Sequence, residues 1–209
     1  MRTSQKIYLP FKRLIGILGS IIGIIFCLAL FWWWIFPINL IVTKGHPVFK
    51  SYRIGRNGKG FNCLKFRTMA LDANPNVAST DVDDANKRTV FGTFLRKTSL
   101  DETLQLFNIL IGQMAFIGPR PLIDVSADSI TNQKRKENGS ICLRPGISGW
   151  AQIHKREKLE AELKAEFDGY YFQNFSLFFD IKIFVITLFY PFIASHTSKD
   201  EEHTKEAKK

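Results

Sequence analysis

An uncharged apolar run over residues 14–42 constrains this chain more than any other feature of its sequence. The run reads LIGILGSIIGIIFCLALFWWWIFPINLIV and holds no Asp, Glu, Lys or Arg. As a continuous helix, at about 1.5 Å per residue, it would exceed the roughly 30 Å hydrocarbon core of a bilayer. It is too long for the apolar part of a signal peptide, and no small-x-small cleavage pattern follows it. The sequence therefore predicts a membrane-associated segment, which we place at residues 1–44.

Positively charged residues flank the apolar run on both sides. Lys12 and Arg13 precede it, and Lys44 and Lys50 are among those that follow it. Because such residues prefer the cytoplasmic face of a membrane, a segment that enters and leaves on one face suits both flanks better than a single span. Pro37 lacks an amide hydrogen and would kink a helix. We therefore expect a re-entrant helix-break-helix, with a single-pass anchor as the alternative.

The distribution of charge indicates what kind of surface the chain meets. The formal net charge is +10, and the first 70 residues carry 11 Lys or Arg and no Asp or Glu, so the whole excess lies there. Nucleic acid and anionic lipid both attract such charge. Here the charge surrounds an apolar run and not a folded domain. This favours anionic membrane lipids as partners and argues against nucleic acid.

A second apolar segment, NFSLFFDIKIFVITLFYPFIAS, occupies residues 174–195. Asp180 and Lys182 interrupt it, so a helix that lies in the membrane interface is a better interpretation than a full span. A helix of the protein core fits the pattern equally well. The charged sequence after it predicts a disordered tail over 196–209. The stretch 45–195 has the length of one folded domain.

Several cations of this domain lie where the backbone can fix them. The stretch 45–69 contains the turn RNGKG between two alternating segments, which predicts a β-hairpin. Lys65 and Arg67, two residues apart, would share one of its faces. Arg120, expected to be buried between two prolines, and Arg144 in RPG sit on stiff backbone that can place a guanidinium. Ordinary solvated or salt-bridged side chains fit each of these positions as well.

Two adjacent carboxylates, Asp101 and Glu102, precede an apolar stretch in SLDETLQLFN. With Ser99 as the N-cap, Glu102 would be the third helical residue and would complete a capping box. Gly112 can end this helix, and Arg96 is close enough in sequence to reach back towards Asp101. The pattern alone describes an ordinary helix start as well as it describes a catalytic pair.

The motifs of several common enzyme classes are absent from the sequence. There is no P-loop and no G-x-G-x-x-G, and the four histidines are too dispersed for a zinc site. No Ser-His-Asp set has a supporting spacing. What remains is a surplus of cations and a few carboxylates beside a membrane segment. Such a site suits an anionic substrate that carries phosphate.

An ordered series of motifs gives the chain a family resemblance. The motifs are KR before the apolar run, GHPVFKSYRIGRNGKGF, KFRTM, GTFLRKTSLDETLQLFNILIGQMAFIGPRPL, RPGISGWAQI and DGYYFQNFSLFFDIKI, spread from Lys12 to Thr187. Each is weak alone, but the set in this order resembles the bacterial sugar transferases, the monotopic polyprenyl-phosphate phosphoglycosyl transferases. Two features depart from the family pattern. Gly16 replaces a usual Asp, and Pro37 lies later than the family's Ser-Pro, which would fall near Leu28.

The resemblance implies a reaction and a site. Members transfer a sugar-1-phosphate from a UDP-sugar to polyprenyl (undecaprenyl) phosphate, release UMP and so start the assembly of capsule, O-antigen, exopolysaccharide or glycoprotein glycans. It implies that Asp101 attacks the β-phosphate and forms a phosphoglycosyl-aspartate. It also implies that Glu102 binds Mg²⁺ or orients Asp101, with both acids near the metal. The cations that it assigns to the phosphates and the nucleotide are Lys65, Arg67, Arg96, Arg120 and Arg144.

The expected fold is α/β: a compact cytosolic domain of short helices and a small β-sheet, anchored by the N-terminal re-entrant helix and by interfacial amphipathic helices. The resemblance implies the bacterial inner membrane, with the domain on the cytoplasmic face. The alternative is a catalytically inactive, membrane-anchored scaffold or binding protein of the same fold. The sequence leaves open which sugar is transferred and whether the chain forms a homodimer.

Overall fold

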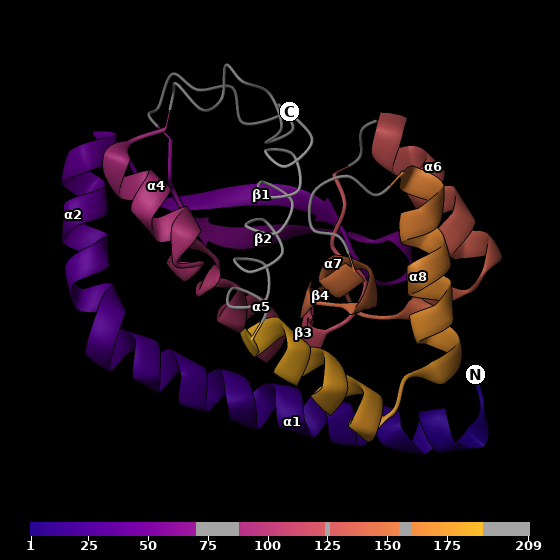
Figure 1. Cartoon of the computed structure of the whole chain (residues 1–209). Coiled ribbons are helices and arrows are strands. Elements are labelled where there is room, and N and C mark those ends of the chain that lie inside the picture. Colours follow the sequence, from indigo (N-terminus) through magenta and orange to yellow (C-terminus); the bar gives the residue numbers. More distant parts are fainter. Residues whose placement is uncertain (70–87, 124–125, 155–159, 190–209) are drawn as a thin grey trace, which may run out of the picture.

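The N-terminal apolar segment forms a long bent helix along one side of the molecule (Figure 1). It consists of helix α1 (Thr3–Cys27), a π-helical turn η1 (Leu28–Trp32) and helix α2 (Trp33–Thr43). The computed structural model describes residues 1–69, 88–123, 126–154 and 160–189. Within these ranges the N-terminal segment is the one helical segment long and apolar enough to cross a membrane, with a mean hydropathy of 2.8 over an 18-residue window. Its length and composition agree with a membrane anchor.

The bend in this segment lies at the π-helical turn and not at Pro37, which is inside α2 (Figure 1). Proline has no N–H to donate, and its ring crowds the carbonyl four residues earlier, here that of Trp33. The disturbance therefore falls directly after the π-helical turn, a form that often accompanies bends. The Trp34 indole donates to the Leu30 carbonyl at 2.9 Å within the turn. The expected kink is therefore displaced towards the position at which the family resemblance places a break.

Helix α1 packs onto the domain through small residues. A Cβ atom added at Gly19 would lie 2.8 Å from the Phe116 ring. One added at Gly23 would lie 3.0 Å from Leu106. The opposite face exposes large apolar side chains, namely Ile7, Phe11, Leu14, Ile15, Leu18, Ile21, Ile22, Ile25 and Phe26. The helix is thus part of the folded body on one side and presents an apolar surface on the other.

The predicted hairpin is present. Strands β1 (Val48–Ile54) and β2 (Gly60–Phe66) pair antiparallel across a 3₁₀ turn at Arg56–Gly58. In this register Lys65 lies opposite Phe49. Alternation along the strands then fixes which side chains share the face of Lys65.

A second, parallel pair of strands was not predicted. Strand β3 (Ala115–Ile117) pairs with β4 (Gly146–Ser148), so the described residues form two two-stranded sheets where one small sheet was expected. The backbones approach closely at the end of this pair. A Cβ atom on Gly118 would lie 2.3 Å from the Arg144 carbonyl oxygen, so the GPRP and RPG motifs meet here.

The remaining helices surround these sheets, and the described fold is mostly helical (Figure 1). They are α4 (Val90–Lys97), α5 (Gln105–Leu110), α6 (Ser126–Glu137), α7 (Trp150–His154), α8 (Ala161–Asn174) and a helix over 177–189, with 3₁₀ turns η3 (Leu100–Glu102) and η4 (Ser140–Cys142). Helix α5 packs on α1, and α6 packs on α8.

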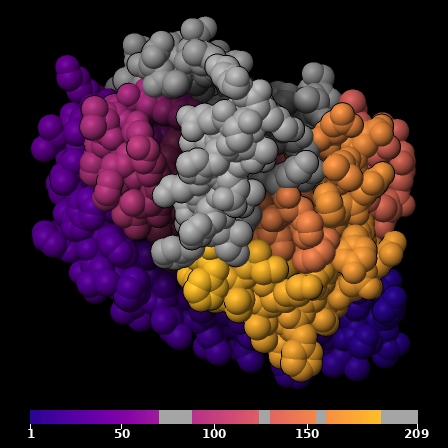
Figure 2. Space-filling model, in the orientation of Figure 1, coloured from indigo at the N-terminus to yellow at the C-terminus, as the bar shows by residue number. Residues whose placement is uncertain are grey.

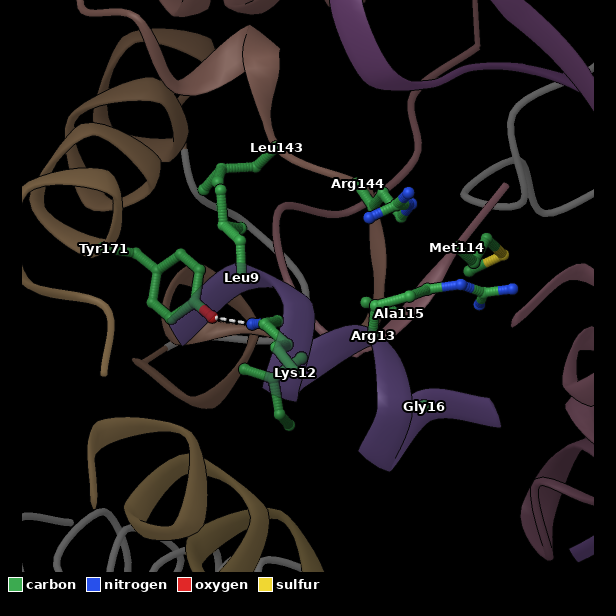
Figure 3. Close-up of a pocket in the computed structure, with 10 residues that line it drawn as sticks. Leu9, Lys12, Arg13, Gly16, Met114, Ala115, Leu143, Arg144 and Tyr171 are labelled. Atoms are coloured by element: carbon green, nitrogen blue, oxygen red, sulfur yellow. Dashed lines mark hydrogen bonds between the residues drawn. The ribbon is translucent and has the colours of Figure 1, made fainter. Parts of the chain in front are cut away.

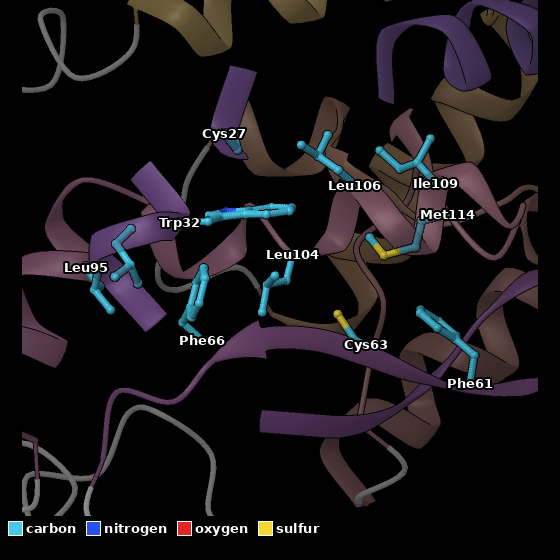
Figure 4. Packing of buried hydrophobic residues seen from close by; sticks show 11 residues of the cluster. Cys27, Trp32, Phe61, Cys63, Phe66, Leu95, Leu104, Leu106, Ile109 and Met114 are labelled. Carbon is cyan, nitrogen blue, oxygen red and sulfur yellow. The ribbon is translucent and has the colours of Figure 1, made fainter. Parts of the chain in front are cut away.

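The main apolar core lies where the bend of the N-terminal segment meets the hairpin and α5 (Figure 4). Trp32, in the bend, is only 2% exposed and stacks on Phe107 with ring centroids 5.4 Å apart. Its Nε1 donates to the Thr103 hydroxyl at 3.0 Å. Thr103 directly follows the acidic pair, so the bend supports the segment that carries Asp101 and Glu102.

The helix over 177–189 is amphipathic. Its buried residues include Asp180 and Ile183, whereas Leu177, Phe178, Ile181, Phe184, Val185, Leu188 and Phe189 are exposed. A helix enclosed in a core would have buried this apolar face. Figure 2 shows the helix in yellow beside the indigo N-terminal segment along the same edge of the molecule. The predicted tail at 196–209 lies outside the described residues.

We expect Gly92→Ala to destabilise the fold by at least about 2 kcal/mol. A Cβ atom at Gly92 would lie 2.0 Å from the Thr68 carbonyl oxygen, so α4 would have to move away from the end of β2. Gly16→Ala is the matched control, because its Cβ atom would meet only Ile109, at 3.5 Å. Thermal unfolding of the detergent-solubilised chain measures both, and equal melting temperatures would contradict the packing described.

Candidate active site

Asp101 and Glu102 lie in the 3₁₀ turn η3 between α4 and α5, and not in the first turn of an α-helix. The predicted capping box is wrong. Ser99 has a φ of 56°, in the left-handed region, and its side chain makes no capping hydrogen bond. Its left-handed backbone links the end of α4 to the 3₁₀ turn. Gly112, with a φ of 88°, follows α5 as predicted.

The two carboxylates have opposite electrostatic environments. Asp101 is 7% exposed, and burial together with the neighbouring Glu102 raises its pKa to about 6. Burial would raise the pKa of Glu102 too, but Lys65, Arg120 and Arg53 more than compensate and lower it. Lys65 Nζ lies 2.7 Å from Oε1 of Glu102. Glu102 is thus an ion-paired carboxylate that stays ionised, whereas Asp101 is a buried carboxylate that takes up a proton easily.

Three of the cations proposed from the sequence act on this pair. Lys65 makes the direct ion pair described above. Arg96 donates from Nε to the Thr68 hydroxyl at 3.0 Å, and its charge favours ionised Asp101. The charge of Arg120 helps to lower the pKa of Glu102. The Arg120 side chain is exposed, however, and not buried as expected. An exposed guanidinium whose charge reaches the acidic pair is available to an incoming anion.

Two other proposed cations point elsewhere. Arg67 donates to the His46 carbonyl at 3.0 Å and lies 5.9 Å from the centre of the Phe49 ring. Arg144 donates to the Gly112 carbonyl at 2.8 Å, behind the end of α5. Burial and two like charges, Arg56 and Arg13, lower the pKa of Arg144. Arg144 is not among the charges that act on either acid.

Sequence reasoning missed Arg53 as a member of the site. It lies on β1, four residues after Phe49, the cross-strand partner of Lys65, and its charge acts on Glu102. Alternation along the predicted hairpin could have found it, because residues 49, 51 and 53 share the face of Lys65. Its Nε donates to the Ser51 hydroxyl at 2.9 Å.

A separate cavity of about 30 Å³ lies between α1, β3, α8 and the segment before β4 (Figure 3). Lys12, Arg13, Arg144 and Tyr171 line it together with apolar side chains, and the acidic pair does not. Lys12 is paired with Asp180, and Arg13 donates to the Ile109 and Leu110 carbonyls. These two flanking cations therefore fasten α1 to the domain.

The acidic pair fits a magnesium ion only in combination with a substrate. Among the described residues, no three His, Cys, Asp or Glu side chains come together as a metal site. Asp101 and Glu102 offer hard oxygen ligands, and Mg²⁺ typically takes one or two carboxylates and completes its shell with water and phosphate oxygens. The donor set is thus compatible with magnesium held jointly by protein and diphosphate.

Comparison with known proteins gives similarity over most of the chain. An "Uncharacterized sugar transferase" of Haemophilus influenzae is 35% identical over 82% of this chain and 38% of that protein. The "Uncharacterized sugar transferase EpsL" of Bacillus subtilis is 38% identical over 74% of this chain and 75% of that protein. The "UDP-glucose:undecaprenyl-phosphate glucose-1-phosphate transferase" of Escherichia coli is 38% identical over 72% of this chain and 34% of that protein. This chain thus spans well under half the length of two of these relatives.

The family match covers nearly all of the N-terminal helical segment and the described strands. The model described as "Bacterial sugar transferase" matches residues 7–193. This range contains the acidic pair, the cations around it and the helix over 177–189. The chain therefore belongs to the bacterial sugar transferase family.

Proposed function

We propose that this chain is a phosphoglycosyl transferase, which moves a sugar-1-phosphate from a UDP-sugar to polyprenyl phosphate and releases UMP. The observation that carries the proposal is the acidic pair itself: a buried carboxylate of raised pKa at Asp101, next to an ion-paired Glu102 and within reach of several cations. The names of the relatives support the substrate classes. Undecaprenyl phosphate is the acceptor named for the E. coli protein and for "Undecaprenyl-phosphate galactose phosphotransferase" of Salmonella typhimurium.

In the first step, a carboxylate oxygen of Asp101 attacks the β-phosphorus of the UDP-sugar. The bond from that phosphorus to the bridging oxygen breaks, and UMP leaves with the electron pair. In the second step, a phosphate oxygen of the polyprenyl phosphate attacks the same phosphorus and displaces Asp101. Covalent catalysis of this kind divides one difficult displacement into two easier ones. Burial favours it, because a poorly solvated carboxylate is a stronger nucleophile than one in water.

The residues around Asp101 neutralise the charge that accumulates when anions meet. Lys65 holds Glu102 in place, and Arg96 and Arg120 supply further positive charge beside the pair. Glu102 and Asp101 are the residues that would hold Mg²⁺. When bound, the ion would neutralise the diphosphate and stabilise the departing UMP.

The apolar faces of α1 and of the helix over 177–189 support a position at the membrane surface. Both faces consist of large exposed apolar side chains, and they lie along one edge of the molecule (Figure 2). The bend at Leu28–Trp32 would let the N-terminal segment enter and leave on one side, as a re-entrant anchor requires. The basic flanks support the anionic cytoplasmic leaflet of the bacterial inner membrane as that side. A lipid-bound acceptor and a soluble donor could then meet at Asp101.

Release of UMP tests the proposed function. The full chain in detergent is given Mg²⁺ and UDP-glucose, UDP-galactose or a UDP-N-acetylhexosamine, with and without undecaprenyl phosphate. With the acceptor present, we expect continuous UMP release from at least one donor, and we expect EDTA to stop it. Without the acceptor, we expect a burst of about one UMP per chain. An inert scaffold releases none. Turnover with the acceptor but no burst without it would instead indicate direct transfer.

The burst of UMP should weaken in acid. Asp101 must be ionised to attack, and its pKa is about 6, so we expect the burst rate to fall about tenfold per pH unit below that value. The burst is measured without acceptor, because a lipid phosphate would add an ionisation of its own in this range. A burst rate that is constant from pH 8 to pH 5 would contradict Asp101 as the nucleophile.

A further inference from the structure

Arg135 on α6 and Asp168 on α8 form a nearly buried ion pair, with side chains 5% and 2% exposed. Nε and Nη2 of Arg135 both donate to Oδ2 of Asp168, at 2.8 and 2.5 Å. Nη1 points away from Asp168 and donates to the carbonyl oxygen of Arg120 at 3.0 Å. One guanidinium therefore joins two helices to the GPRP turn.

Other contacts already join α6 to α8 without this pair. The Thr131 hydroxyl donates to the Ala161 carbonyl at 3.0 Å, and the Asn138 amide donates to the Ala165 carbonyl at 2.8 Å. A buried ion pair is also a poor device for packing two helices, because apolar side chains of similar size stabilise them as well or better. The bond to the GPRP turn is the one function of this guanidinium that an apolar side chain could not supply.

The GPRP turn over 118–121 is fixed from two sides. On one side Gly118 N–H donates to the Ser148 carbonyl of β4 at 2.8 Å. On the other, the buried ion pair holds the carbonyl of Arg120. Because a proline on each side limits backbone rotation, fixing this carbonyl also fixes the direction in which the Arg120 side chain leaves the turn. That side chain is exposed, and its charge acts on Glu102.

We propose that Arg135, held in place by Asp168, is a positioning residue for Arg120. It touches neither acid of the pair and acts only through the backbone from which the Arg120 guanidinium reaches the site. The planar fork of Arg135 suits this task, because it can serve a carboxylate and a carbonyl at fixed angles. The catalytic consequence of this inference rests on the proposed function, whereas the structural consequence does not.

Hydrogen exchange tests the structural part without any assay of activity. The variant Arg135→Met/Asp168→Leu removes both charges, so no unpaired buried charge is left to unfold the protein. Thr131→Val is the matched control, since it removes another α6–α8 hydrogen bond and leaves Arg120 untouched. A second variant, Arg135→Lys, keeps a cation beside Asp168 but lacks the fork. We expect amides of residues 115–123 to exchange at least about tenfold faster in Arg135→Met/Asp168→Leu and in Arg135→Lys, and at the wild-type rate in Thr131→Val. Unchanged exchange in both would overturn the proposal.

A mutant cycle with Arg120→Ala tests the catalytic part. In UMP release from UDP-glucose or UDP-galactose with undecaprenyl phosphate, we expect Arg135→Met/Asp168→Leu to lower kcat/KM about tenfold or more, with Thr131→Val within twofold of wild type. Added to Arg120→Ala, the pair variant should cost less than about twofold further. Effects that multiply, or faster exchange with unchanged kcat/KM, would overturn the positioning role. Failure of the proposed function appears separately, as wild-type protein that releases no UMP from any donor.

Discussion

Asp101→Asn is expected to abolish UMP release, lowering kcat by at least about 10³-fold, and to leave the protein folded. The amide has nearly the shape of the carboxylate but no charge, and it does not attack phosphorus. No burst should form without acceptor, because the covalent intermediate needs this oxygen. Mass spectrometry of the wild-type chain mixed with UDP-sugar alone should find the added phosphosugar on the peptide that contains Asp101, and the variant should lack it.

The same substitution should stabilise the protein at neutral pH, which separates loss of chemistry from loss of folding. The folded-state pKa of Asp101, about 6, lies above its ordinary value of 3.8, so the folded state disfavours the charged form. This cost is fully present above pH 6, shrinks as the pH falls through 6 towards 4, and vanishes when both states are protonated. We therefore expect Asp101→Asn to melt at or above the wild-type temperature at pH 7.5, with the difference lost near pH 4.

Glu162→Gln is a suitable control for this experiment. Its side chain is 62% exposed and pairs with Lys134 at 3.0 Å on the surface, so the substitution removes a carboxylate far from the chemistry. We expect its activity and its melting temperature to match wild type. Equal activity of Asp101→Asn and wild type would show that the nucleophile is another residue, and a variant that is inactive but unfolded would show that Asp101 is structural.

Features that depend on neighbouring residues could be predicted from the sequence, and those that depend on distant ones could not. The hairpin follows from a short turn between alternating segments, and it was predicted together with the position of Lys65. The parallel pairing of β3 with β4 joins residues about thirty positions apart in sequence, and three-residue strands carry no periodic signal. The approach of Gly118 to the Arg144 backbone belongs to the same long-range contact.

The candidate site shows the same division. The resemblance assigned Asp101 and Glu102, and the structure adds why their pKa values shift in opposite directions. Burial favours the protonated form of both, but Lys65 pairs only with Glu102. Stiff backbone at the two Arg-Pro motifs was predicted, but the destination of each side chain was not. Arg120 emerges beside Glu102, whereas Arg144 turns back to the end of α5, at the Gly112 carbonyl. Which way a guanidinium points depends on the packing of segments that the local sequence does not describe.

The bent N-terminal segment also proved to be more than an anchor. A helix that served only as an anchor would need no specific contact with the rest of the fold. Here Trp32 is buried against Phe107 and bonded to Thr103, beside the acidic pair. The glycines of α1, which in the sequence look like helix-loosening residues, let the helix approach α5 and β3. The N-terminal segment and the turn that carries the acidic pair therefore form one packed unit, and disturbing the contacts between them should cost stability.

Lys12→Met is expected to destabilise the fold by about 3 kcal/mol, because it leaves Asp180 buried without its cation. Lys12 Nζ lies 2.6 Å from Oδ2 of Asp180, and the two side chains are only 15% and 10% exposed. The hydroxyls of Tyr8 and Tyr171 also donate to Asp180, at 2.8 and 2.5 Å, but neither carries charge. Thermal and urea unfolding of the detergent-solubilised chain measure the loss.

Two further variants decide whether this loss comes from the ion pair. In Lys12→Met/Asp180→Asn the buried charge is gone and the amide oxygen can still accept from the tyrosines, so most of the lost stability should return. Lys6→Met changes an exposed lysine of the same helix and should shift the free energy of unfolding by less than about 0.5 kcal/mol. If the double variant is as unstable as Lys12→Met, the lysine stem and not its charge holds α1 to the helix over 177–189. If it recovers, the loss comes from the unpaired charge of Asp180, and the contacts that remain, among them the hydrogen bond from Tyr8, suffice to hold α1 to the helix over 177–189.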